Sequence, residues 1–205
     1  MIYHTPILFH KIFKNIIWTG KDDSIYLTFD DGPNEKATNE ILEVLNEFKI
    51  LATFFSIGKK ISENAKLLKQ VEFQGHKIGN HGFNHSRLLA FSNSKVTNSI
   101  IKTEKEFELN QIKFEKLYRP PFGFFLPHNI SAIQKLNYKI VMWNILAGEF
   151  LNWSDDKILI HIEKYLKPGA IIVFHDNETT ANRIKITLRK TILRIKDLGY
   201  SFNAI

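Results

Sequence analysis

Two adjacent aspartates, Asp30 and Asp31, are the residues whose type and setting first suggest chemistry. They follow the run 25–29, whose β-branched and aromatic residues predict a short strand, and Gly32-Pro33 ends that strand. Because α/β folds bind ligands at the carboxyl ends of their strands, we expect both acids at a cleft. Two carboxylates so close need a cation nearby, and a metal ligand beside a general base is one arrangement that provides it. An ordinary surface turn is the other interpretation.

A second group of candidate ligands lies in the run from Asn80 to His85, after another predicted strand. Its imidazoles, His81 and His85, are four residues apart and can converge on one ion. With one aspartate they would form a three-ligand site with open positions, which is typical of a catalytic metal. Zinc suits this ligand set best, and Co²⁺, Ni²⁺ and Fe²⁺ are the alternatives. Solvated loop histidines are the other interpretation of this spacing.

Two more polar residues follow predicted strands. Arg119 precedes Pro120-Pro121, and its guanidinium can hold a carboxylate in a fixed orientation. His175 ends a buried-type strand, where an imidazole can act as a general acid around neutral pH. Taken singly, a rigid turn with a surface arginine and a structural histidine explain these residues as readily.

Aromatic residues accompany the acid Glu149, which lies between Trp143 and Trp153. Aromatic rings beside a cleft suit the faces of sugars, and buried tryptophan packing is the alternative.

Strands and helices are predicted to alternate along the chain, which indicates a parallel sheet with helices outside it. The predicted strands are 25–29, 51–57, 77–80, 116–118, 138–143, 170–174 and 200–202. The predicted helices are 35–48, 59–74, 94–110, 129–136, 155–166 and 180–198. A full eight-unit barrel typically needs about 250 residues, so 205 residues predict a shortened or irregular barrel. An open doubly wound sheet is the alternative.

The composition indicates one soluble domain with a full core, since 44% of the residues are hydrophobic. The net charge of +7 raises the question of nucleic acid, but no nucleic-acid-binding motif is present and no such partner is expected. Basic residues gather only in 183–196, where a solvated helix face is preferred to a polymer-binding stripe. The lack of cysteine excludes disulfides and thiolate zinc sites. No signal peptide or membrane span is predicted, so the default location is cytoplasmic, with action at the cell envelope left open.

Four of these runs occur in the order of known sequence motifs. Together they resemble the polysaccharide deacetylase (NodB-homology) family, carbohydrate esterase family 4. Residues 28–33 resemble the family's first motif and 81–85 its second. Residues 119–123 resemble the third motif and 173–175 the fifth. The resemblance covers 25–176 and implies a distorted (β/α) barrel with fewer than eight full units, about seven. We therefore expect one deacetylase domain over 1–205, with 1–24 as an N-terminal extension that packs on the barrel.

The resemblance also implies an activity and the residues that carry it. The activity is metal-dependent removal of acetyl groups from an N-acetylated glycan, such as peptidoglycan or a chitin-like oligosaccharide. Asp30 would be the general base, paired with Arg119, and His175 the general acid. The metal ligands would be Asp31, His81 and His85. The substrate-binding residues would be Pro121, Phe122, Trp143, Glu149 and Val173.

The sequence departs from the family pattern at two places. Gly82 stands where the family usually has Ser or Thr, so the histidine loop lacks a bracing hydroxyl there. The fourth motif is altered around Asn144, and we align Glu149 with the family's acid and Phe150 with its tryptophan. Two alternative functions therefore stay open: a non-catalytic glycan-binding barrel, and a related hydrolase of small cyclic amides.

Overall fold

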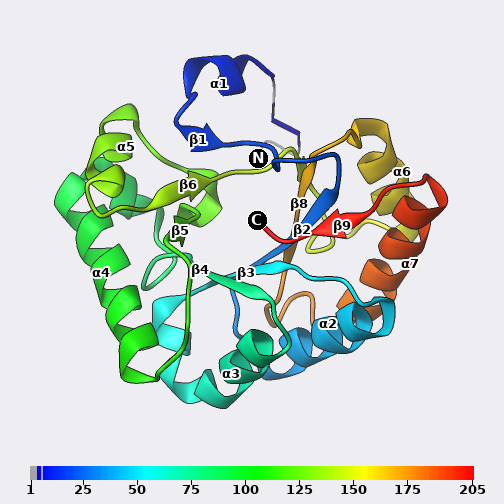
Figure 1. Cartoon of the computed structure of the whole chain (residues 1–205), viewed down its shortest axis with the longest axis horizontal. Coiled ribbons are helices and arrows are strands. Elements are labelled where there is room, and N and C mark those ends of the chain that lie inside the picture. Colours follow the sequence, from blue (N-terminus) through cyan, green and yellow to red (C-terminus); the bar gives the residue numbers. More distant parts are fainter. Residues whose placement is uncertain (1–3, 6) are drawn as a thin grey trace.

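The strands of this protein form one curled sheet, and helices cover its outer side (Figure 1). The computed structural model describes residues 4, 5 and 7–205. Its strands are β1 (Ile16–Ile17), β2 (Ile25–Asp30), β3 (Thr53–Ser56), β4 (Lys77–Asn80), β5 (Leu117–Tyr118), β6 (Lys139–Val141), β7 (Ile145–Leu146), β8 (Ile171–His175) and β9 (Phe202–Asn203). Its α-helices are α1 (Ile7–Ile12), α2 (Glu35–Phe48), α3 (Ala65–Phe73), α4 (Asn93–Leu109), α5 (Pro127–Gln134), α6 (Asp155–Tyr165) and α7 (Ile184–Asp197). Short 3₁₀ helices are η1 (Gly58–Lys60), η2 (Ser62–Asn64), η3 (Arg87–Phe91) and η4 (Pro121–Gly123).

The strand order identifies the sheet as a barrel wall. Neighbouring strands follow the order β1-β6-β5-β4-β3-β2-β8-β7, with β9 beside β2, and the ladders between them are parallel. From β2 to β6 the order advances in one direction, so the connecting helices lie on the same outer side (Figure 1). An open doubly wound sheet would reverse direction and carry helices on both faces. The predicted distorted (β/α) barrel with fewer than eight full units is therefore confirmed.

The alternation of side chains along β2 separates an outer core from the barrel interior. Ile25, Leu27 and Phe29 pack in the hydrophobic cluster that includes α2 and α7, whereas Tyr26 packs in the inner cluster. Because successive strand residues point to opposite faces, Asp30 shares the inner side with Tyr26. The alternation of side chains along β2 thus places the Asp30 carboxylate at the mouth of the barrel, where the strand ends.

Several predicted elements are longer than those observed, and hydrogen bonds account for two of the differences. The predicted helix 59–74 is divided into η1, η2 and α3, and the Asn64 side chain donates to the Lys60 carbonyl at 2.9 Å within the irregular part. The predicted strand 138–143 ends at Val141. There the Arg119 guanidinium donates to the carbonyls of Val141 and Met142, at 3.2 Å each, and so occupies acceptors of the strand backbone.

The N-terminal segment lies between the two edges of the curled sheet. β1 pairs with β6 on one side, and the His4 backbone forms an antiparallel bridge with Ile145 of β7 on the other. The Thr5 N–H donates to the Asn144 carbonyl at 3.1 Å. Residues 1–3 and 6 of the expected N-terminal extension lie outside the described residues.

The basic residues of α7 pair with acids of the flanking helices. Lys185 and Arg189 contact Glu43 and Glu47 of α2, and Arg194 contacts Glu163 of α6 at 2.6 Å. These ion pairs agree with a solvated helix face, as preferred from the sequence. No described helix combines the length and hydrophobicity that crossing a membrane requires.

Candidate active site

Asp31, His81 and His85 bring three potential metal-ligand atoms together at the barrel mouth. Asp31 follows β2, and the two histidines lie in the loop after β4. Asp31 Oδ1 lies 3.5 Å from His81 Nε2 and 3.1 Å from His85 Nε2. The three ligand atoms all lie within 4.8 Å of one another. The two histidines and one aspartate predicted to converge are therefore adjacent in space.

The spacing and the unused atoms of this triad fit a tetrahedral metal ion. Metal–ligand bonds of about 2.1 Å in a tetrahedron separate the ligand atoms by about 3.4 Å, close to the two separations between Asp31 Oδ1 and the imidazoles. Asp31 Oδ1 is buried and accepts no hydrogen bond from the described residues. His81 Nδ1 lies 2.8 Å from the Arg119 carbonyl, which orients the ring so that Nε2 faces the triad.

The surroundings of the triad favour the protonation states that metal ligands need at Asp31 and His85, but not at His81. Burial lowers the pKa of His81, but the nearby Asp30 and Asp31 carboxylates outweigh it and raise the pKa, so a metal ion would have to displace a proton there. Burial opposes ionisation of Asp31, but the neighbouring His81 outweighs it and keeps the pKa of Asp31 below its ordinary value. Burial, with the charge of His81, lowers the pKa of His85 to about 4, so this imidazole is neutral at pH 7.

Asp30 occupies a separate environment from its neighbour. Its Oδ1 accepts a hydrogen bond of 2.7 Å from Arg119 Nη1, and the guanidinium is fully buried. Arg119 Nη1 also donates to the Thr28 hydroxyl at 2.8 Å, and its guanidinium lies 4.2 Å from the centre of the Phe55 ring. Asp30 Oδ2 points toward the triad and lies 3.9 Å from His81 Nε2. Arg119 therefore fixes one carboxylate oxygen of Asp30 and leaves the other at the cleft.

His175 faces Asp30 from the neighbouring strand, and Glu149 holds it there. Asp30 and His175 are partners in the β2–β8 ladder. Glu149 Oε1 lies 2.8 Å from His175 Nδ1 and also accepts the His175 backbone N–H at 2.7 Å. Burial lowers the pKa of His175, but the Glu149 carboxylate outweighs it and raises the pKa to about 9. The imidazole is therefore protonated at neutral pH.

A cleft of about 210 Å³ connects these groups. Trp143 and Val173 line it, as do Phe122 and Phe150, and the Phe150 ring packs edge-on against His175 with ring centres 4.8 Å apart. Pro121, the first residue of η4, is buried, and Phe122 and Gly123 are the residues of η4 that line the cleft. Glu149 lies behind His175 and is buried. The structure thus brings most of the predicted site residues together. Arg119 and Glu149 contact residues that line the cleft, whereas Pro121 and Trp153 are not among its lining residues.

Three side chains that support the site were not singled out from the sequence. Asn177 Nδ2 donates to Asp31 Oδ2 at 3.0 Å, although 146 positions separate the two residues. Ser99 of α4 accepts the Phe83 N–H at 2.7 Å, and Asn80 Oδ1 accepts the Gly82 N–H at 2.8 Å. The side chains of Ser99 and Asn80 thus hold the histidine loop, although Gly82 itself has no hydroxyl to do so. The place of Asn177, two residues after His175 at a strand end, is the one sequence signal that indicates its role.

Comparisons with known proteins agree with this geometry. The family model described as polysaccharide deacetylase matches residues 19–141. The peptidoglycan-N-acetylglucosamine deacetylase of Bacillus cereus is 34% identical over 180 residues, which are 87% of this chain and 84% of that protein. The chitooligosaccharide deacetylase of Azorhizobium caulinodans is 31% identical over 159 residues, 77% of this chain and 76% of that one. The solved Bc1960 peptidoglycan N-acetylglucosamine deacetylase has a TM-score of 0.86 at 28% identity, covering 98% of this chain and 95% of its own. Membership of the polysaccharide deacetylase family thus follows for this chain from both its sequence and its fold.

Proposed function

We propose that this protein is a metal-dependent hydrolase that removes acetyl groups from an N-acetylated glycan. The observation that carries the proposal is the placement of Asp30 and His175 beside the Asp31–His81–His85 triad in one cleft. The relatives are named for deacetylation of peptidoglycan and chitooligosaccharides, which supports an amino-sugar polymer as the substrate.

Asp31, His81 and His85 are the residues that would hold the metal, and we propose zinc because two imidazoles and one carboxylate suit it. A bound divalent ion supplies Lewis acidity, which acidifies a water molecule and polarises the acetyl carbonyl. A site with only three protein ligands leaves coordination positions open for water and substrate.

The other residues of the cleft would handle protons and orient the substrate. Asp30 takes a proton from the attacking water, and Arg119 keeps its carboxylate oriented. His175, protonated at neutral pH, gives a proton to the leaving nitrogen as the C–N bond breaks, so the products are acetate and a free amine. Glu149 stabilises the imidazolium.

The acetyl group and the sugar would contact the apolar walls of the cleft. Val173 is buried, lines the cleft and suits the acetyl methyl, and Trp143 offers a ring in the same cleft. The Phe122 backbone N–H is the proposed donor to the oxygen that becomes negative. Pro121 is proposed to stiffen the loop that presents this group.

Acetate release from N-acetylated oligosaccharides, measured with and without zinc, tests this function. Turnover should require the metal and should fall by about 10²-fold or more in the Asp30→Asn variant. Zinc-loaded protein that releases no acetate from peptidoglycan or chitin-like oligomers would contradict the proposal.

A further inference from the structure

An aromatic pocket adjoins the catalytic cleft and takes no part in the reaction described above. It has a volume of about 280 Å³ and shares Phe122, Gly123 and Trp143 with the cleft. The two spaces therefore adjoin along these three residues. A substrate longer than one sugar can extend from one space into the other.

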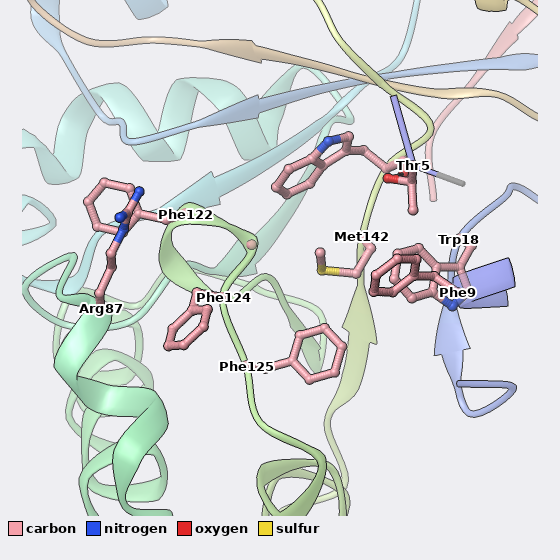
Figure 2. A pocket seen from close by; sticks show the side chains of 10 residues that line it. Thr5, Phe9, Trp18, Arg87, Phe122, Phe124, Phe125 and Met142 are labelled. Atoms are coloured by element: carbon pink, nitrogen blue, oxygen red, sulfur yellow. Dashed lines mark hydrogen bonds between the residues drawn. The ribbon is translucent and has the colours of Figure 1, made fainter. Parts of the chain in front are cut away.

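Four separate parts of the chain build this aromatic pocket: the N-terminal segment, Arg87, 122–125 and 142–143. Figure 2 shows Arg87 and Phe122 on one side, Phe9 and Trp18 on the opposite side, and Met142 between them. Phe9 belongs to α1 and Trp18 follows β1, so the N-terminal segment supplies one wall. The rings of Phe9 and Phe122 are partly exposed, whereas Trp18 is buried. The pocket thus offers accessible ring faces over a fixed base, which is how proteins commonly bind flat apolar surfaces.

Arg87 adds a positive charge at the edge of this pocket. Its guanidinium lies 4.5 Å from the centre of the Phe122 ring, and the same ring lies 4.3 Å from the His85 ring. Arg87 forms no ion pair with an acid among the described side chains. A guanidinium stacked on an aromatic ring keeps its N–H edge free for a carboxylate.

We propose that the aromatic pocket binds the sugar next to the one that is deacetylated, and that Arg87 pairs with a carboxylate on that sugar. This inference rests on the proposed function. A sugar ring presents an apolar C–H face that suits the aromatic walls, and the shared wall keeps it within reach of the cleft. The preferred substrate is therefore a glycan with an acidic sugar beside the reacting one, over a neutral chitin-like chain. Peptidoglycan strands fit this description where the muramic acid carries no stem peptide and its carboxylate is free.

The charge of the neighbouring sugar can be tested with one matched pair of substrates. The pair is a tetrasaccharide of alternating N-acetylglucosamine and N-acetylmuramic acid, and the same molecule with its carboxylates converted to amides. Zinc-loaded wild-type protein should favour the carboxylate form by about tenfold in kcat/KM, since charged hydrogen bonds of this kind are strong. The Arg87→Gln variant should bring this ratio close to one. The Arg189→Gln variant, which removes an exposed arginine from α7, should keep the wild-type ratio.

The aromatic wall is tested by the Phe9→Ala variant. KM for the tetrasaccharide should rise about threefold or more with kcat little changed, because the lost ring would face the neighbouring sugar and not the one that reacts. The Phe73→Ala variant removes a ring that is 92% exposed on α3 and serves as the control. A tetrasaccharide KM that does not change in Phe9→Ala would overturn the role of this wall.

Binding measurements separate this inference from the proposed reaction. Calorimetry with the Asp30→Asn variant should show the same carboxylate preference in Kd without turnover. A second outcome is that no glycan releases acetate while the carboxylate preference in Kd is found and is lost in Arg87→Gln. That result would support the role of the aromatic pocket and contradict the proposed reaction. Equal affinity for the carboxylate and amide forms would overturn the role of Arg87, even if both are deacetylated.

Discussion

Asp30 and Asp31 are neighbours in the chain, but their side chains have different partners. Asp30 is tied to the buried Arg119 guanidinium, whereas Asp31 faces two imidazoles and keeps one oxygen unused. Asp31 adopts a left-handed backbone conformation, with φ of 78°, at the point where β2 ends. The change of backbone direction at this residue explains how two successive side chains reach the same cleft despite the alternation of a strand.

This division of surroundings predicts different losses from two equivalent substitutions. Asp31→Asn should weaken zinc affinity by about tenfold or more, because it removes the anionic ligand. Asp30→Asn should retain zinc and lose turnover. Zinc titration by calorimetry together with acetate release measures both properties. Equal zinc affinities in the two variants would show that the carboxylates do not have separate roles.

The pair of His175 and Glu149 predicts the alkaline limit of activity. A general acid must carry its proton, so kcat/KM should fall as pH rises through the pKa of about 9. Glu149→Gln removes the charge that raises this pKa, so the alkaline limb should move down by about one pH unit or more. The pH profile of acetate release measures the shift. Glu163→Gln, which breaks an exposed pair with Arg194, is the matched control and should leave the limb in place.

At the scale of elements, the site is assembled from strand ends and the loops that follow them. β2, β4, β5 and β8 each lead into residues of the cleft. The loop after β5 has an additional constraint, since Phe122 and Gly123 both have positive φ, of 59° and 63°. An added Cβ at Gly123 would overlap the Trp143 ring. This glycine therefore allows the loop to approach the wall that the cleft and the aromatic pocket share.

Two alanine substitutions separate backbone strain from this close approach. Gly199 also has positive φ, of 85°, but an added Cβ there meets nothing within 4 Å. Gly199→Ala should cost about 1–2 kcal/mol of stability from the left-handed conformation alone. Gly123→Ala should cost at least about 1 kcal/mol more and should raise KM, because the ring of Trp143 must move. Chemical denaturation and KM for the tetrasaccharide measure the two effects, and equal losses in both variants would contradict the close-approach argument.

At the scale of the whole molecule, the barrel could be predicted from the alternation of strands and helices along the chain. Each of these elements is recognised from the spacing of its own hydrophobic residues. The groups after β2, β4, β5 and β8 were predicted for the same reason, since each follows an apolar strand. Contacts between residues that are far apart in the sequence could not be predicted from these patterns. Asn177 reaches Asp31, and the N-terminal Phe9 and Trp18 reach the loop after β5 only because the sheet curls. Sequence reasoning that works within one element cannot specify such pairs.

Asp176 links the stability of the whole fold to pH. Its carboxyl group is buried where β8 meets α2, with Oδ2 accepting from the Thr38 hydroxyl at 2.7 Å and Oδ1 without a hydrogen-bond partner among the described residues. Burial, reinforced by the charge of Asp31, raises the pKa of Asp176 to about 7 from an ordinary value of 3.8. Between these values the folded state binds more protons than the unfolded state, so stability falls as pH rises from about 4 to 7.

Asp176→Asn should relieve this loss, because an amide keeps an acceptor for Thr38 without a buried charge. For the metal-free protein, the free energy of unfolding of the variant relative to wild type should be higher at pH 8.5 than at pH 5 by roughly 2 kcal/mol or more. Urea denaturation at both pH values measures the difference. The exposed Asp197→Asn change on α7 should follow the wild-type pH dependence. The same relative stability of Asp176→Asn at both pH values would show that the pKa of this carboxyl group is not raised in the folded protein.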